Sequence, residues 1–199
     1  MTNEVLVTDS DLNRSLWVTT SLAKKGINVT LGGEIGLKNC AFYSKYCRCR
    51  VLYPSPVKNK ETFINSIKKI AGNYEVVIPL HERTIIPMSE HLNEFRPMVN
   101  IPIPAYEVLN IALDKAETIM YARKAGIPIP TTYFVSDLKE LKSVAKDLTY
   151  PIILKMRREI LAPPPRYLYA YNPNDLVKKY KEMHRKGDYP LIQEIISGV

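Results

Sequence analysis

Short runs of Val, Ile and Leu alternate with helix-like patterns along the first half of the chain. Residues 5–7, 27–31, 50–52 and 76–78 are apolar runs of strand length, and their β-branched residues favour buried strands. Strands that alternate with helices are typical of a parallel sheet joined by right-handed crossovers. The pattern therefore predicts a small α/β domain.

Apolar residues at helical spacing predict the crossover helices. The first helix is expected to be capped by Asp9 or Ser10 and to end at Gly26, with an inner face formed by Leu12, Leu16 and Ala23. A second helix precedes the fourth strand, and its apolar residues recur with a period of about 3.6 at Phe63, Ile64, Ile67, Ile70 and Ala71.

Two spaced prolines in residues 99–105 favour extended chain and indicate a linker. We therefore expect one domain over residues 1–105 and another over residues 106–199. The second contains strand-like runs at 132–135, 152–154, 167–170 and 190–194. Its helices are expected to start at Asp114 and Ser136 and at a later apolar pattern, with inner residues Ala116, Ile119, Met120, Leu138, Leu141, Ala145, Leu148, Leu176, Val177 and Tyr180.

Lys155 stands where the apolar run of Ile152, Ile153 and Leu154 ends. A buried ammonium group needs an anionic partner, because burial without one is costly or removes its proton. A bound phosphate is one such partner. The alternative is a lysine that reaches solvent along its own methylene chain, and this residue alone does not decide between the two.

Two further motifs accompany Lys155 and favour the phosphate. Asp114-Lys115 opens an amphipathic stretch, and Gln193-Glu194 lies in a short apolar strand that breaks at a glycine. In this order the three motifs resemble the ATP-grasp superfamily, and more closely its carbamoyl-phosphate-synthase-like and biotin-carboxylase-like members. The resemblance spans nearly all 199 residues.

The resemblance implies both a fold and a site. Residues 1–105 would form the α/β domain that precedes the grasp, and residues 106–199 the first, nucleotide-holding α+β subdomain. Lys115 and Lys155 would contact the phosphates of ATP. Backbone groups around Glu194 and Ile196 would hold adenine, together with the polar side chain of Gln193 or Glu194. Magnesium is the other implied cofactor, with ligands beyond Val199 and none within this chain.

Residues 156–166 depart from the family pattern. The superfamily usually has a glycine-rich loop here, whose backbone N–H groups close over the phosphates. This stretch has no glycine, and the three prolines from Pro163 to Pro165 have no N–H group to offer. Arg157 is our candidate ATP ligand in the loop, and Arg158 and Arg166 could add charge. A lid stiffened by the prolines and a solvated basic loop are the alternatives.

A polar turn follows the strand at 76–78, at the edge where parallel sheets bind ligands. Glu82 and Arg83 are candidates for contact with an acceptor substrate, and His81 is a candidate cap for the next helix. The alternative is a purely structural turn. Thr8-Asp9-Ser10-Asp11 puts two carboxylates where a dinucleotide needs glycines, and the chain has no P-loop motif, so neither of those nucleotide sites is expected.

Composition and charge narrow the range of partners. The 28 basic and 20 acidic side chains leave a net charge of +8, spread over both halves rather than gathered in an arm as in many nucleic-acid-binding proteins. The segment 43–48, with its tyrosines and cations, comes closest to such a surface. The sequence shows neither a membrane span nor an export signal, so a cytoplasmic protein is expected. The 3 cysteines favour neither disulfides nor zinc.

These observations lead to an expected ATP- and magnesium-dependent ligase. In that reaction ATP activates a small carboxylate as an acylphosphate, which an amine or similar nucleophile attacks. We expect the chain to be the N-terminal portion of such an enzyme and to be inactive alone, so whether it is itself an enzyme stays open. The missing half is an expected partner. Self-association is also expected, through an unpaired edge at residues 190–196 and an open apolar face at Leu191, Ile192, Ile195, Ile196 and Val199.

Two other functions are compatible with the sequence. One is a noncatalytic nucleotide-binding or scaffold module, which could share the same nucleotide contacts. The other is a basic RNA-binding protein, which the even distribution of charge disfavours.

Overall fold

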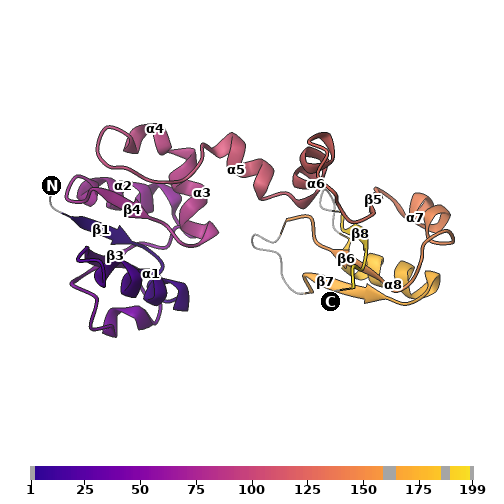
Figure 1. Ribbon diagram of the computed structural model, residues 1–199, viewed down its shortest axis with the longest axis horizontal. Coiled ribbons are helices and arrows are strands. Elements are labelled where there is room, and N and C mark those ends of the chain that lie inside the picture. The colour runs from indigo at the N-terminus through magenta and orange to yellow at the C-terminus, as the bar shows by residue number, and fades with distance from the viewer. Residues whose placement is uncertain (1–2, 159–164, 185–188, 198–199) are drawn as a thin grey trace. The chain divides into compact units, whose positions relative to one another are not determined.

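The computed structural model describes residues 3–158, 165–184 and 189–197. The chain forms two compact units, Met1–Leu109 and Asn110–Val199, each with its own four-stranded sheet (Figure 1). One sheet is parallel and the other is antiparallel. This confirms the predicted fold class, an α/β unit followed by an α+β unit.

The sheet of the first unit has four parallel strands in the order β3-β2-β1-β4. Their bounds are β1 Glu4–Val7, β2 Asn28–Glu34, β3 Cys49–Tyr53 and β4 Val76–Ile78. In the central strand Leu6 pairs with Thr30 of β2 and with Val77 of β4. The four apolar runs therefore form the predicted parallel sheet.

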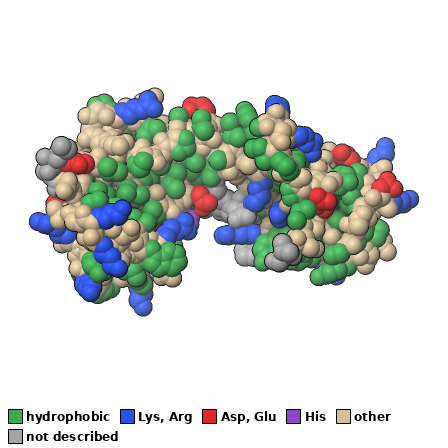
Figure 2. All heavy atoms as spheres, viewed as in Figure 1, with side chains coloured by type: hydrophobic (Ala, Val, Ile, Leu, Met, Phe, Trp, Pro, Cys, Tyr) green, Lys and Arg blue, Asp and Glu red, His purple; other side chains and the backbone are tan. Residues whose placement is uncertain are grey.

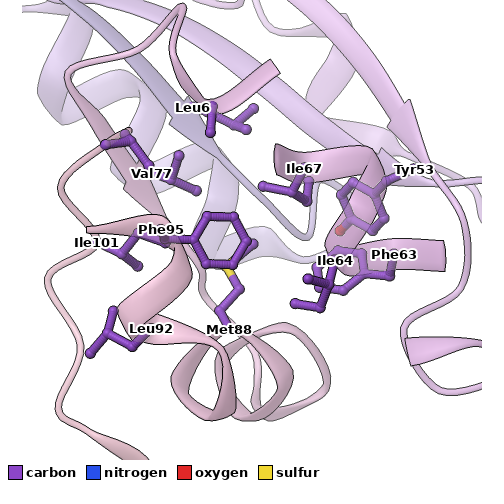
Figure 3. Packing of buried hydrophobic residues seen from close by; sticks show 12 residues of the cluster. Leu6, Tyr53, Phe63, Ile64, Ile67, Val77, Met88, Leu92, Phe95 and Ile101 are labelled. Carbon is purple, nitrogen blue, oxygen red and sulfur yellow. The ribbon is translucent and has the colours of Figure 1, made fainter. Parts of the chain in front are cut away.

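Helices cover both faces of this sheet. The bounds are α1 Asn13–Ala23, the 3-10 helix η1 Cys40–Tyr43, α2 Lys60–Ala71, α3 Glu82–Glu90 and α4 Leu92–Phe95. Neighbouring strand residues point to opposite faces, so Val5 and Val7 pack with α1 and η1 while Leu6 packs with α2, α3 and α4. Figure 3 shows Phe95 and Met88 meeting the side chains of α2 in this second cluster.

The predicted inner face of α1 is wrong. Ser15 and Thr19 are the buried residues of this helix, whereas Leu16 is 39% exposed. The predicted cap is also wrong, because Leu12 occupies the N-cap position and makes no side-chain capping bond. Asp9 instead adopts a positive φ of 61° and binds residues of α3. By contrast, the predicted face of α2 is confirmed.

The first residues of the proline-containing segment 99–105 pack into the core of the first unit. The carbonyl of Asn100 accepts a hydrogen bond from Val77 N at 2.9 Å, and Val99 and Ile101 are buried. Helix α5, Tyr106–Ala112, follows, and the boundary between the two compact units falls inside it. The assignment of residues 1–105 and 106–199 as separate functional domains stays a prediction.

The sheet of the second unit is antiparallel, with strand order β5-β8-β6-β7. Its strands are β5 Thr132–Phe134, β6 Ile152–Lys155, β7 Tyr167–Ala170 and β8 Leu191–Glu194, and its helices are α6 Lys115–Lys124, α7 Leu138–Val144 and α8 Pro173–Met183. Leu141 of α7 and Tyr180 of α8 share a core with Leu154 and Ile192. Helices α7 and α8 therefore cover one face of the sheet, and the site described below lies on the opposite face.

The expected unpaired edge at residues 190–196 is wrong. Strand β8 is central, because it pairs with β5 on one side and β6 on the other. Leu191 and Ile192 are buried, so they do not form an open apolar face. Ile195 and Ile196 do remain exposed beyond the strand, and self-association stays a prediction.

The helix starts of the second unit match the sequence only in part. Asp114 caps α6 as predicted, accepting hydrogen bonds from two backbone N–H groups. Helix α7 is capped by Asp137 rather than Ser136, because the backbone and hydroxyl of Ser136 both bind the carboxylate of Glu140. The predicted inner residues Met120 and Leu138 are exposed.

Several predictions concern segments or groups away from these cores. Residues 159–164, with Pro163 and Pro164, lie outside the described residues, as do the glycine at 198 and Val199. The 3 cysteines are free. In the described ranges no helix combines the length and apolar character needed to cross a membrane.

Candidate functional site

Lys155 stands at the end of β6, on the face of the antiparallel sheet opposite α7 and α8. Its half-buried side chain donates a hydrogen bond from Nζ to Gln193 Oε1 at 2.7 Å. Gln193 is 6% exposed and donates from Nε2 to Thr132 Oγ1 at 2.9 Å. A chain of polar side chains thus crosses three strands and holds the ammonium group in place.

The charge of Lys155 is not cancelled by these contacts. The amide oxygen of Gln193 is neutral, and within the described ranges no carboxylate is within ion-pair distance of Lys155 Nζ. A half-buried cation that is positioned by a neutral group attracts an anion at its open side. This geometry favours the phosphate interpretation of Lys155 over a lysine that merely reaches solvent.

Lys115 is brought to the same strand end by the start of α6. Its backbone N–H donates to the carbonyl of Arg157 at 3.1 Å, and its Nζ donates to the carbonyl of Met156 at 3.2 Å. The two residues that follow Lys155 therefore hold Lys115. The structure joins the first two sequence motifs at one end of β6.

Asp114 strengthens this junction. Its carboxylate is 2% exposed and accepts from Arg157 Nε at 2.6 and 2.8 Å and from Arg158 Nε at 3.2 Å, besides capping α6. Burial acts to raise the pKa of Asp114, but the hydrogen bond and charge of Arg157 outweigh it and hold that pKa below its usual value. Arg157 thus joins β6 to α6, a role that the sequence did not suggest.

The third motif makes hydrogen bonds within the sheet. The side-chain amide of Gln193 is hydrogen-bonded to Lys155 and Thr132. The carboxylate of Glu194 accepts a hydrogen bond from Thr131 N at 2.7 Å, and the backbone N–H of Glu194 donates to Thr131 O at 3.0 Å. Ile196 lies beyond β8 and is exposed. Adenine contacts by Glu194 and Ile196 therefore stay a prediction, with the Glu194 N–H already paired.

Two tyrosines share the face of Lys155, and the sequence analysis did not assign them to the nucleotide site. Tyr167 pairs with Lys155 across β7 and β6, and Tyr169 pairs with Ile153. Their side chains are 58% and 42% exposed, and their rings meet edge to face at 6.0 Å between centroids. The signal was present, because in the run Tyr-Leu-Tyr-Ala the aromatic residues alternate with residues of the covered face.

The first unit places its candidate residues at the carboxyl end of its sheet. Arg83 Nε donates to Asp9 Oδ1 at 2.9 Å, and the same guanidinium binds Asp11. The fully buried Asp9 also accepts from Thr84 Oγ1 and from a backbone N–H. Arg83 is thus part of a structural network within this unit.

His81 and Glu82 complete that turn. His81 Nδ1 accepts from the backbone N–H of Arg83 at 3.2 Å, which confirms the predicted cap of α3. The carboxylate of Glu82 is about half exposed and lies 3.9 Å from His81 Nε2. Contact of Glu82 or Arg83 with an acceptor substrate stays a prediction.

The described residues offer no obvious metal site. Within the described ranges, no group of three or more His, Cys, Asp or Glu side chains is placed to hold a metal ion. A cavity of about 160 Å³ lies beside β8 and is lined by Arg157, Tyr189 and Leu191, among others. This volume is well below the roughly 300 Å³ at which small-molecule pockets begin.

Comparisons with known proteins support the fold. Neither family models nor curated proteins match the sequence. Among solved structures, an L-amino acid ligase from Bacillus licheniformis matches with a TM-score of 0.69 at 12% identity, over 98% of this chain and 44% of that one. The biotin carboxylase domain of a Hydrogenobacter thermophilus 2-oxoglutarate carboxylase, solved with ADP, magnesium and bicarbonate, matches with a TM-score of 0.65 at 19% identity, over 98% and 44%.

A third similar structure is the N5-carboxyaminoimidazole synthetase from Staphylococcus aureus, solved with ADP. It has a TM-score of 0.69 at 14% identity, over 98% of this chain and 48% of that one. These are ATP-grasp enzymes, and the likeness shows that the chain has their fold. The chain spans less than half the length of each.

Proposed function

We propose that the face of the antiparallel sheet that carries Lys155, opposite α7 and α8, is one wall of an ATP site. The observation that carries this proposal is Lys155, a half-buried ammonium held by the neutral amide of Gln193 with no described carboxylate beside it. The similar enzymes that were solved with ADP support the choice of an adenine nucleotide as the anion.

The residues of this wall have separate roles in the proposal. Lys155 contacts a phosphate directly, and Gln193 orients Lys155 instead of hydrogen-bonding to adenine. Lys115 exchanges its bond to the carbonyl of Met156 for a second phosphate contact, because an ionised partner gives a stronger hydrogen bond than a neutral one. Tyr167 and Tyr169 offer aromatic surface to the flat purine, and polar groups at Glu194 and Ile196 meet its edge.

Arg157 has a positioning role in this proposal rather than a primary phosphate contact. Its Nε is bound to both oxygens of Asp114, so its charge is largely compensated. The ion pair keeps the N-terminus of α6, which starts with Lys115, next to the end of β6, which finishes with Lys155. A helix N-terminus also favours nearby negative charge, which suits a phosphate at this junction.

The reaction that we propose for the whole enzyme is carboxylate ligation. The γ-phosphoryl group of ATP moves to a carboxylate oxygen as ADP leaves, and an amine or similar nucleophile then attacks the acyl carbon and expels phosphate. A carbamoyl-phosphate-synthase-like or biotin-carboxylase-like enzyme in the cytoplasm is the finer form of the proposal. Glu82 is the candidate for contact with the acceptor. The described residues do not fit magnesium, so no step is assigned to that ion here.

Thermal unfolding in the presence of ATP and magnesium tests the nucleotide site. A ligand that binds only the folded state stabilises it by about 2.7 kcal/mol at a hundred times its Kd. We expect Lys155→Ala to remove most of the ATP-induced rise in Tm and Lys115→Ala to reduce it. Lys178→Ala is the matched control, because Lys178 is an exposed lysine of α8, the helix on the other face of the sheet. An undiminished rise in the Lys155 variant contradicts the assignment.

The noncatalytic alternative predicts the same binding but a different turnover. In the whole enzyme, a ligase should release ADP faster when both a carboxylate and an amine are present. ADP release that does not respond to either compound in a broad panel supports the noncatalytic module instead.

A further inference from the structure

Helix α1 packs Val18 and Leu22 against the sheet but presents Leu16 and Trp17 to solvent. Its buried side holds the small hydroxyl residues Ser15 and Thr19, while Leu16 is 39% exposed and Trp17 is 69% exposed. Trp17 is the only tryptophan of the chain, and it has no ring contact within the described residues. The sheet beneath does not need these side chains, and large apolar residues exposed side by side are typical of an interaction surface.

Trp17 and Leu16 form one wall of a groove between α1 and the segment that follows η1. The groove has a volume of about 540 Å³ and is open to the surface. Its lining residues are Leu16, Trp17, Thr20, Ser21 and Lys24 from α1, and Ser44, Lys45 and Tyr46 from the other side. Because the groove is shallow and open, it suits one side of an extended or helical segment better than an enclosed small molecule. We call these eight residues the α1 groove.

The segment of the chain that carries the α1 groove is strongly basic, and Lys24 and Lys45 line the groove itself. Between residues 12 and 53 the only acidic residue is Glu34, which is buried, and the basic residues are Arg14, Lys24, Lys25, Lys38, Lys45, Arg48 and Arg50. Figure 2 shows Lys and Arg side chains among hydrophobic ones over the part of the first unit that carries α1. Lys24 and Lys25 follow the C-terminus of α1, where cations are favourable, but this does not account for Lys45 on the opposite wall.

The aromatic rings next to the groove already carry cations. Lys45 Nζ lies 5.2 Å from the ring centroid of Tyr46, and the guanidinium of Arg50 lies 5.7 Å from that of Tyr43. Single-stranded nucleic acids need free ring faces on which several bases stack. Among the rings described at the groove, Trp17 alone has no cation beside it, so the arrangement resembles one aromatic anchor with paired cations more than a row of stacking platforms, which disfavours RNA as the occupant.

We propose that the α1 groove binds an acidic amphipathic segment of a partner protein. Apolar side chains of that segment would bury Leu16 and Trp17, and its carboxylates would meet Lys24 and Lys45 at the rim. This is the common mode in which an amphipathic helix lies in a hydrophobic groove, with the charge complementarity that speeds association. A second copy of this chain would bring like charge to the same rim, so self-pairing through the groove is disfavoured.

Trp17 reports on its own site, because the chain has no other tryptophan. The probe is a synthetic, tryptophan-free amphipathic helix of Glu and Leu with blocked ends. Transfer of the indole from water into an apolar contact should shift its emission to shorter wavelengths in a saturable manner. The same peptide with Gln in place of every Glu should bind at least about tenfold more weakly, because it keeps the apolar face and loses the charges.

Matched variants separate the groove from general charge attraction. Lys24→Glu with Lys45→Glu should weaken binding about tenfold, since each exposed pair contributes a modest amount and is replaced by repulsion. Lys58→Glu with Lys69→Glu makes the same change in net charge at exposed positions before and within α2, on the other face of the sheet, and should have little effect. Trp17→Ser, followed with a fluorescein-labelled peptide, should weaken binding of the amphipathic helix but not of polyglutamate.

Several results would overturn the proposal. An unshifted Trp17 emission at saturating peptide, equal affinity for the Gln peptide, or equal losses in the two double-Lys variants would each show that the groove does not recognise the segment. Tighter binding of an oligouridylate with quenching of Trp17 would assign the surface to nucleic acid. All four substituted positions and Trp17 are exposed, so unchanged thermal unfolding should show that the variants fold. The proposal does not depend on ATP binding by the second unit.

Discussion

Replacement of Asp114 by Ala tests the junction that places the two candidate lysines. The carboxylate of Asp114 is 2% exposed, caps α6 and accepts from two arginines. Its removal takes away the cap and leaves Arg157 without its main partner. If this junction is as important as its contacts indicate, the loss of stability should exceed that of a simple helix cap.

The magnitude follows from the two parts of the interaction. Loss of an N-cap costs about 1 kcal/mol. Breaking a buried ion pair costs roughly 3–5 kcal/mol, but the side chain of Arg157 is 34% exposed, so solvent reduces this to about 2 kcal/mol. We therefore expect Asp114→Ala to lower the free energy of unfolding by about 3 kcal/mol.

Urea unfolding followed by circular dichroism measures this change, and Asp137→Ala is the matched control. Asp137 caps α7 through two backbone N–H groups, as Asp114 caps α6, but it is exposed and has no arginine among its described hydrogen-bond partners. Its loss should be clearly smaller. Equal losses in the two variants would refute the reasoning, because the arginines would then contribute nothing beyond the cap.

Three further predictions concern pH and the first unit. The pKa of Asp114 is held below its usual value by Arg157. The stability that this carboxylate contributes is therefore present above about pH 4 and is lost as the pH falls below that value. In urea unfolding, the difference in free energy of unfolding between wild type and Asp114→Ala should shrink as the pH is lowered below about 4. Asp9→Ala removes the fully buried acceptor of Arg83, Thr84 and the Leu80 N–H and leaves Arg83 with Asp11 alone. It should lower the free energy of unfolding by about 3 kcal/mol, with a loss below about 1 kcal/mol contradicting the network. Thr19→Val removes a buried hydroxyl that has no partner in the described structure and should raise the free energy of unfolding by about 1 kcal/mol, whereas a destabilised variant would show that the hydroxyl is hydrogen-bonded.

The sequence was most informative where a local pattern decides the structure. The β-branched run before Lys155 became a buried strand, and Asp114 became a helix cap, because each depends on neighbours within a few residues. The face of α2 followed from the spacing of its apolar residues. Local spacing misled in α1, where small hydroxyl residues fit closely against the sheet and the larger Leu16 remained outside.

Non-local pairing could not be predicted in the same way. The position of β8 between β5 and β6 depends on strands that are distant in sequence, so an edge strand and a central strand look alike in a short apolar run. The same limit hid the contact of Arg157 with Asp114 and the shared face of Tyr167 and Lys155. The capping role of Asp9 failed for a related reason, because Arg83 and Thr84 compete for its carboxylate.

The most direct test of the central claim is an NMR titration of this chain with ADP. The account predicts saturable shifts centred on Lys155, Gln193, Tyr167 and Tyr169, on the sheet face opposite α7 and α8. Lys155→Ala should abolish these shifts, whereas Lys178→Ala should preserve them. Saturable shifts confined to the covered face around α7 and α8, or no saturable shift at millimolar ADP, would contradict the assignment of this face as the wall of a nucleotide site.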